Sequence, residues 1–261
     1  MGKIKIYYVT NSKWAPSFEA LQKNLGNRYC LAKIFTEKGV TEFDGKGVEV
    51  SRNKINKAWK EIDGSNNNFV LINGCHYIVK KKVLDKIDVL VLHPTLLPKG
   101  RKNAPLNHAI RNGDKVGGVT LFYARGELDE VDSGPIIYQR SFQIGERDNV
   151  SDLLQKANFA SGEIYATLLK NWPNVPKREQ DHTLATYNRR LRPEDGEILP
   201  EMDYSTRDRI IRSLDSPFYP APFAVIDGEQ RIIKGIVGET KEEGEIYNLG
   251  GIKMIIEKKL K

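Results

Sequence analysis

Short apolar runs alternate with stretches of helical periodicity through the first two thirds of the chain. Runs rich in β-branched and aromatic residues predict strands at residues 3–10, 29–35, 69–72, 87–92, 119–123 and 136–142. Apolar positions three and four apart predict helices at residues 16–25, 55–62, 79–84, 104–110 and 150–172. The run at 87–92 is almost continuously apolar, which is typical of a parallel strand buried on both faces. The alternation predicts an α/β fold with a doubly wound, mostly parallel sheet.

The pattern changes after residue 172. Pro173 and Pro176 lie among charged residues, which indicates a linker at residues 173–181. Beyond the linker, the sequence predicts one helix and three short strands, at residues 205–214, 223–226, 231–236 and 253–257. We therefore expect two domains, a larger one at residues 1–172 and a small α+β subdomain at residues 181–261.

Composition narrows the class of protein. No apolar run approaches the ~20 residues that a membrane helix needs, and Lys3 and Lys5 interrupt the apolar start of the chain, unlike a signal peptide. We expect a cytoplasmic protein that makes no membrane contact. Cys30 and Cys75 stand alone rather than in a paired motif, so they predict free thiols, no disulfide framework and no metal site.

The formal net charge is +7. A positive balance attracts phosphates, whether in nucleic acid, in a nucleotide-linked substrate or in the anionic tail of a cofactor. The basic residues are scattered among acidic ones, so a solvated charged surface explains the balance equally well. Charge therefore does not choose among these partners.

Polar residues follow three of the predicted strands, at residues 73–77, 93–101 and 126–134. Ligands of open parallel sheets bind beyond the carboxyl ends of the strands, so these segments are candidates for the site. His93 directly follows the buried run and precedes Pro94, which restricts His93 to an extended backbone. It is either a proton donor and acceptor near neutral pH or a structural histidine bonded to a backbone carbonyl.

A second candidate lies in the segment GELDEVDSGPI, where several acidic residues crowd between two glycines. A carboxylate beside a histidine stabilises the imidazolium form, a pairing that suits acyl-type transfer. Spacing alone does not say which carboxylate would do this, and most of them are typical of a solvated turn.

Two motifs, HPTLLPKGRKNAPLNHAIRNGD and GGVTLFYARGELDEVDSGPI, resemble the folate-dependent formyltransferase domain over residues 69–170. That family includes glycinamide ribonucleotide, methionyl-tRNA and nucleotide-sugar formyltransferases. The resemblance implies a Rossmann-like formyltransferase fold at residues 1–172. It also implies a catalytic triad in which the histidine is His93 and the aspartate is Asp132.

The third member of the triad, an asparagine two residues before the histidine, is replaced by Val91. Valine has no group that donates to a developing oxyanion, and the loss of one such donor commonly costs about a hundredfold or more in rate. Either a backbone amide or another side chain such as Asn103 supports catalysis, or the site binds without catalysing.

The resemblance further implies 10-formyltetrahydrofolate as the formyl donor, held mainly by main-chain contacts. The residues expected to bind its pterin are Gly74, Cys75, His76, Tyr77, Ile78, Glu127, Leu128, Asp129, Glu130 and Val131. Those expected to bind the acceptor substrate are Pro94, Thr95, Lys99, Arg101, Arg190 and Tyr219.

The C-terminal segments YNRRLRPEDGEI and STRDRIIRSLDSPFYPAPFAVIDGE resemble the extension of sugar N-formyltransferases over residues 187–228. The implied acceptor is the amine of a nucleotide-linked amino-deoxysugar, with a UDP-4-amino-4,6-dideoxy-N-acetyl-altrosamine of pseudaminic-acid-type pathways as the most specific suggestion. A methionyl-tRNA or aminoacyl acceptor is an alternative, although the ~80 residues here are few for a tRNA-binding barrel. A non-catalytic folate or nucleotide-binding module and a formyl-folate hydrolase are further alternatives. We expect a small-molecule partner rather than nucleic acid, and the chain could form a homodimer.

Overall fold

A computed structural model describes residues 2–52, 54–74, 78–126 and 131–257. The chain forms two compact units, each built from several segments. The first unit comprises Met1–Lys102, Gly117–Phe142 and Gln155–Tyr187, and the second comprises Asn103–Val116, Gln143–Leu154 and Asn188–Lys261. The expected division into domains at residues 1–172 and 181–261 stays a prediction.

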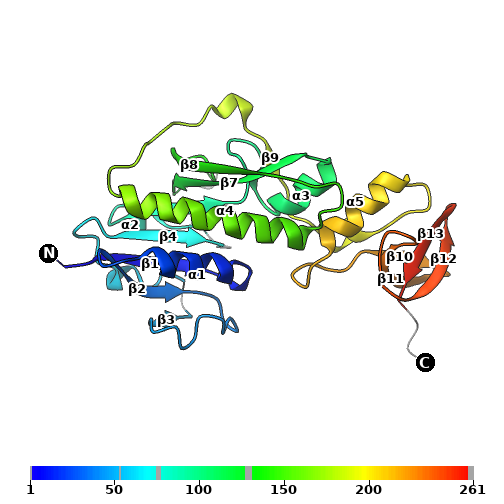
Figure 1. The fold of residues 1–261 in the computed structure, drawn as a ribbon, viewed down its shortest axis with the longest axis horizontal. Helices are drawn as coiled ribbons and strands as arrows, with labels where there is room; N and C mark the ends of the chain where they lie inside the picture. The colour runs from blue at the N-terminus through cyan, green and yellow to red at the C-terminus, as the bar shows by residue number, and fades with distance from the viewer. Residues whose placement is uncertain (1, 53, 75–77, 127–130, 258–261) are drawn as a thin grey trace. The chain divides into compact units, whose positions relative to one another are not determined.

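The first unit is built on a seven-stranded sheet with the order β3-β2-β1-β4-β5-β7-β8 (Figure 1). The five strands from β3 to β5 pair in parallel, and β5 pairs with β7 antiparallel. The predicted doubly wound, mostly parallel sheet is thereby confirmed. The strands are β1 (Ile4–Thr10), β2 (Tyr29–Phe35), β3 (Val50–Ser51), β4 (Phe69–Asn73), β5 (Asp88–His93), β7 (Val116–Tyr123) and β8 (Ile136–Gln143).

Successive side chains of β1 pack on opposite faces of this sheet. Tyr8 contacts Phe18 of α1 (Ala15–Asn24), with ring centroids 5.4 Å apart, and its hydroxyl lies 3.5 Å from that of Tyr165 on α4 (Val150–Asn171). α1 and α4 run side by side on this face (Figure 1). Tyr7 and Val9 instead join a core with apolar residues of segments 55–62 and 79–87. Both faces are covered, as a parallel sheet requires.

One predicted helix is wrong. Residues 55–62 form turns followed by a single 3₁₀ helix, η2 (Trp59–Glu61). Their apolar residues are buried as the pattern required, but Asn56 uses its side chain to accept from the Lys80 N–H at 2.8 Å and to donate to the Ile78 carbonyl at 2.7 Å. These bonds to another segment hold the chain in a compact turn. The helix α2 is likewise short (Lys81–Leu84).

The second unit contains a four-stranded sheet with the order β10-β11-β13-β12, packed against the helix α5 (Tyr204–Leu214). Its strands are β10 (Phe223–Ile226), β11 (Glu229–Ile236), β12 (Glu245–Leu249) and β13 (Ile252–Ile256). The small α+β subdomain expected near the C-terminus is confirmed, although β12, whose side chains are mostly exposed, was not predicted. The second unit also contains α3 (Pro105–Asn112) and η5 (Pro193–Gly196).

Three short elements remain: η1 (Ser12–Trp14), η4 (His182–Leu184) and the two-stranded sheet of β6 (Arg101–Lys102) and β9 (Tyr187–Asn188). In the part of the chain that the structure describes, no helix combines the length and the apolar character needed to cross a membrane.

Candidate active site

His93 ends β5 and is buried in the first unit, where it pairs across the sheet with Thr120 of β7. Its Nε2 lies 3.0 Å from the carbonyl oxygen of Gly100. Because a carbonyl oxygen only accepts, this contact requires a hydrogen on Nε2. The carbonyl-bonded histidine considered from the sequence is therefore present, and Nδ1 is the ring nitrogen left for other work.

Nδ1 of His93 lies 3.7 Å from Oδ2 of Asp132. The two side chains are only 9% and 12% exposed, so water screens the electrostatic interaction between the ring and the carboxylate only weakly. The distance is longer than a direct hydrogen bond, and it places an imidazole and a carboxylate side by side at the carboxyl end of a parallel strand. The structure thus brings together the two residues that the sequence singled out.

Asp132 is held by the chain segment that follows β5. Its Oδ2 accepts from the backbone N–H of Lys102 at 2.8 Å. Both residues have left-handed backbones, with φ of +76° at Lys102 and +59° at Asp132. Such conformations cost about 1 kcal/mol or more each outside glycine, and they persist only where surrounding contacts enforce them. Two strained residues therefore meet at the bond that orients this carboxylate.

Val91 lies two residues before His93 and on the same face of β5. It packs against Leu97, Phe122 and Ile136, a small apolar cluster beside the site. At the position where formyltransferases carry an asparagine, this chain therefore has an apolar side chain in an apolar cluster.

A network of hydrogen bonds extends from the site to Gln180, which lies 48 residues beyond Asp132 and 79 residues beyond Arg101. The Arg101 guanidinium, 1% exposed, donates to Oε1 of Gln180 at 2.7 Å and lies 3.2 Å from Nδ1 of His182. Gln180 in turn donates to the carbonyl oxygens of Asp132 at 2.9 Å and Gly134 at 2.7 Å. Gln180 was not among the predicted residues, because no motif near it in the sequence indicates contacts with residues 101 and 132.

A family model described as formyl transferase matches residues 16–169, which is more than half of the chain. The chain belongs to the formyl transferase family. The methionyl-tRNA formyltransferase of Pseudothermotoga lettingae is 34% identical over 178 residues, which are 66% of this chain and 57% of that protein. This chain therefore spans just over half the length of that curated relative.

Solved structures of the family share the fold. A methionyl-tRNA formyltransferase from Clostridium thermocellum matches with a TM-score of 0.68 and 19% identity, over 98% of this chain and 99% of that one. An N-formyltransferase from Helicobacter canadensis, in complex with folinic acid and dTDP-3-aminofucose, matches with a TM-score of 0.69 and 15% identity, over 98% of this chain and 100% of that one. At these identities the likeness concerns the fold alone.

Several residues predicted from the sequence lie close to the His93–Asp132 pair along the chain. Pro94 and Thr95 follow His93 directly, and Thr95 donates its N–H to the His93 carbonyl at 2.9 Å. Lys99 is exposed, whereas the Arg101 side chain is occupied by the network described above. The acceptor-binding roles of these residues stay predictions.

The remaining predicted residues fall in the second unit, at three described positions of the first unit, or outside the described residues. Asn103 donates its backbone N–H to the Asn188 carbonyl at 3.3 Å, Arg190 is exposed, and Tyr219 packs in the core of the second unit, where burial raises its pKa. Of the pterin contacts, residues 75–77 and 127–130 lie outside the described residues, whereas Gly74, Ile78 and Val131 are described.

Within residues 2–52, 54–74, 78–126 and 131–257, no group of three or more His, Cys, Asp or Glu side chains is arranged to hold a metal ion.

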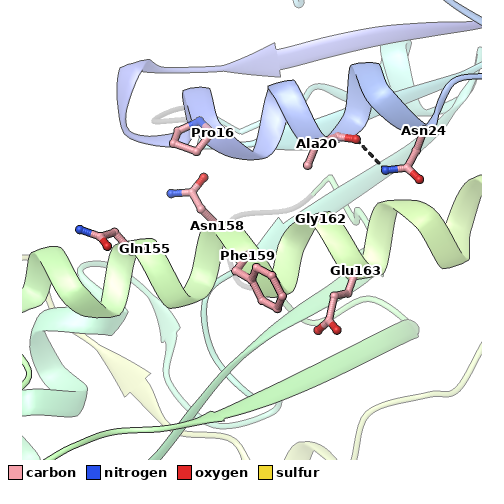
Figure 2. A pocket seen from close by; sticks show the side chains of 8 residues that line it. All are labelled: Pro16, Ala20, Asn24, Gln155, Asn158, Phe159, Gly162 and Glu163. Carbon is pink, nitrogen blue, oxygen red and sulfur yellow. Dashed lines mark hydrogen bonds between the residues drawn. The ribbon is translucent and has the colours of Figure 1, made fainter.

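A groove of about 480 Å³ runs between α1 and α4 and is lined by Ala20, Phe159 and Gly162 among others (Figure 2). The groove lies between the two helices that cover the Tyr8 face of the sheet, whereas Val91 and His93 belong to the other face.

Proposed function

We propose that this chain is an N-formyltransferase that moves the formyl group of 10-formyltetrahydrofolate to a primary amine. The observation that carries the proposal is the approach of His93 Nδ1 to Asp132 Oδ2 at 3.7 Å, within the two motifs of the family. A buried imidazole next to a carboxylate can stabilise negative charge and accept a proton, which are the two tasks of acyl-type transfer to an amine.

The residues of the site fit a formyl donor. Formyl transfer needs polar groups that stabilise charge and move a proton, and His93 and Asp132 are such a pair at a strand end. When bound, 10-formyltetrahydrofolate supplies an activated one-carbon group at the oxidation level of formate. Support for this donor comes from the folinic acid complex of the Helicobacter canadensis protein. Main-chain contacts from residues 74–78 and 127–131 are proposed to hold its pterin.

The two side chains divide the work as follows. His93 is anchored through Nε2 to the Gly100 carbonyl, so its ring orientation is fixed and Nδ1 faces the reacting groups. With a hydrogen on Nδ1, the ring donates toward the oxygen on which charge develops. Asp132 orients the ring, takes a proton from the attacking nitrogen, directly or through one water molecule, and returns that proton to the departing donor nitrogen as its bond to the formyl carbon breaks. Because Val91 cannot donate, a backbone amide or Asn103 is the proposed second donor.

We propose the amine of a nucleotide-linked amino-deoxysugar as the acceptor. The C-terminal segments at residues 187–228 support this proposal by their resemblance to the extension of sugar N-formyltransferases. The dTDP-3-aminofucose in the Helicobacter canadensis complex is a ligand of the same class. A UDP-4-amino-4,6-dideoxy-N-acetyl-altrosamine of pseudaminic-acid-type pathways is the most specific candidate. The cytoplasmic location and a homodimer stay predictions.

Methionyl-tRNA is the second candidate acceptor, and a specific observation favours it. The relatives found by sequence in Pseudothermotoga lettingae and Fusobacterium nucleatum, 34% and 30% identical, are both named methionyl-tRNA formyltransferases. The Clostridium thermocellum enzyme also aligns over nearly its whole length with this chain, so the length of the chain does not argue against this acceptor.

A panel of acceptors tests the proposal. The purified chain is incubated with 10-formyltetrahydrofolate and, in parallel, UDP-, GDP- and dTDP-linked amino sugars, methionyl-tRNA, or no acceptor, and the formylated product is measured. Formylation of one amino sugar well above methionyl-tRNA supports the proposed acceptor. Preference for methionyl-tRNA, with a steep loss of rate at high salt, supports the second candidate. Formate release without acceptor indicates a hydrolase, and donor binding without any product indicates a binding module.

A further inference from the structure

Gln180 contacts both the Asp132 turn and the segment after His93 through buried hydrogen bonds. It is 5% exposed, and the oxygen and the NH₂ group of its side-chain amide face different partners. Oε1 accepts from Arg101, and Nε2 donates to the carbonyl oxygens of Asp132 and Gly134. The side chain therefore spans the two loops that carry the candidate catalytic pair.

Chemistry fixes which way this amide points. A guanidinium only donates, and backbone carbonyl oxygens only accept. With the amide reversed, its NH₂ would face the NH₂ of Arg101 and its oxygen would face two carbonyl oxygens, and all of these contacts would be repulsive. Arg101 thus holds the Gln180 NH₂ group against the turn that contains Asp132.

The same downstream segment also holds the other loop. The backbone N–H of Arg101 donates to the Thr186 carbonyl at 2.9 Å, and the N–H of Gly100 donates to Thr186 Oγ1 at 2.8 Å. The carbonyl of Gly100 is the partner of His93 Nε2, and the residue after Arg101 is Lys102, whose N–H holds Asp132. The contacts of His93 with Gly100 and of Asp132 with Lys102 therefore come from a segment that Thr186 holds by hydrogen bonds at Gly100 and Arg101.

We propose that Gln180 is a positioning residue for formyl transfer, with Arg101 as its support. The left-handed backbone of Asp132 has to be enforced by its surroundings, and the bonds from Gln180 to the carbonyls of residues 132 and 134 clamp both sides of that turn. The kinetic part of this proposal rests on the proposed function, whereas its structural part concerns the geometry of His93 and Asp132 without substrate.

The test uses Gln180→Glu, which keeps the size of the side chain and its contact to Arg101 but cannot donate to the two carbonyls. The first measurement is the ¹⁵N NMR signal of the His93 ring nitrogens at one fixed pH, compared with Asp132→Asn. We expect Gln180→Glu to move the Nδ1 signal toward its position in Asp132→Asn. Glu179→Gln, which alters an exposed neighbour paired with Arg125, is the matched control and should leave the signal unchanged.

The second measurement is a double-mutant cycle on formyl transfer. We expect Gln180→Glu to lower kcat about tenfold or more, with the KM for the formyl donor within about twofold, because misplacement of a catalytic group affects the transition state. In the Asp132→Asn background the same change should cause little further loss, since it acts through Asp132. A merely structural role would instead give effects that multiply.

Each outcome is decisive. Wild-type ring signals in Gln180→Glu, or a full multiplicative loss in the Asp132→Asn background, would overturn the positioning role. If Gln180→Glu does not fold, Arg101→Lys replaces it. That variant frees the Gln180 amide without removing it, and it should move the ring signal in the same direction by a smaller amount. If the wild-type chain formylates no acceptor, the proposed function fails, and the NMR comparison still decides the role of Gln180.

Discussion

The side chains of Asn73 and His93 lie on opposite faces of the sheet, although the two residues end neighbouring strands. Asn73 pairs with Leu92 rather than with His93, and its Nδ2 donates to Ser17 Oγ and to the Tyr165 hydroxyl, each at 2.9 Å. This buried asparagine therefore cannot take the place of the amide that formyltransferases carry at position 91. Whatever supports His93 has to come from the face that Val91 occupies.

The first prediction concerns the catalytic pair. His93→Ala and Asp132→Asn should each lower kcat by about a hundredfold or more and change the Kd of the formyl donor only slightly, because both act on developing charge rather than on the pterin. Asp88→Asn, at the exposed opposite end of the same strand β5, is the control. Near-normal turnover in either site variant, with a confirmed acceptor, would show that its residue has been given the wrong role.

Much of the fold could be predicted from the sequence because burial on both faces leaves a plain signal. The run at 87–92 became β5 within one residue at either end, and the alternation of strands with helical segments correctly predicted a doubly wound, mostly parallel sheet. The segment at 55–62 shows the limit of that signal. Its apolar spacing correctly predicted which side chains are buried, but the bonds of Asn56 to residues 78 and 80 decided its local conformation.

The candidate site could be predicted only where chemistry lies next to a strand. His93 stands directly after a buried strand, and Asp132 stands in a motif of the family. Gln180 carries neither signal, since its importance arises from bonds to residues 101, 132 and 134, which are distant in sequence. Contacts of that kind depend on how the chain returns to the sheet, which no local pattern encodes.

The second prediction concerns the glycine of the Asp132 turn. A Cβ atom at Gly134 would lie 1.7 Å from the backbone oxygen of Tyr123, so Gly134→Ala must displace either the turn or the end of β7. We expect a loss of about 1 to 3 kcal/mol in the free energy of unfolding together with reduced turnover. Urea unfolding measures the first and the formylation assay the second. Gly145→Ala, where the nearest atom is a movable carboxylate oxygen of Asp148 at 3.2 Å, should be nearly neutral, and equal effects of the two changes would contradict this account.

The third prediction concerns acid stability of the second unit. The Arg189 guanidinium and the Arg192 N–H hold the pKa of Asp195 well below its usual value of 3.8. A carboxylate with a lowered folded pKa stabilises the fold above about pH 4, and this contribution is lost as pH falls below that value. Asp195→Asn should therefore lose about 1 to 3 kcal/mol at pH 7, and the difference from wild type should shrink toward pH 2.5. A difference that is constant across pH would rule out the carboxylate as its source.

The fourth prediction concerns removal of residues 181–261. Within the second unit, Asn107 of α3 donates to the Ser213 carbonyl at 2.7 Å, and Arg111 donates to the Asp195 carbonyl at 2.5 Å. The truncation removes both partners and exposes the apolar side of α3, so we expect an insoluble or non-cooperatively melting fragment. Soluble yield and a thermal melt by circular dichroism check this. A soluble fragment that melts cooperatively and binds the formyl donor would show that α3 does not need the rest of the second unit.

The fifth prediction concerns Val91, where this chain departs most clearly from its family. If a backbone amide or another side chain already serves the developing charge, Val91→Asn should change kcat only modestly. Its amide would enter a cluster of Leu97, Phe122 and Ile136, which offers apolar contacts, so we expect a loss of about 1 to 3 kcal/mol in the free energy of unfolding. Val91→Leu is the matched control for shape, because leucine has the same branching and the same number of non-hydrogen side-chain atoms as asparagine but no amide.

Activity and melting temperature are measured together for wild type, Val91→Asn and Val91→Leu, so that loss of the fold is not mistaken for loss of chemistry. A wild-type chain that transfers formyl, with both variants altered only in proportion to their stability, confirms that the missing asparagine has a substitute. The opposite pattern is a wild-type chain without transfer and a Val91→Asn variant that gains it. Gain of function from that one amide would mean that His93 and Asp132 are correctly placed by the fold, and that the absent donor alone separates this chain from catalysis.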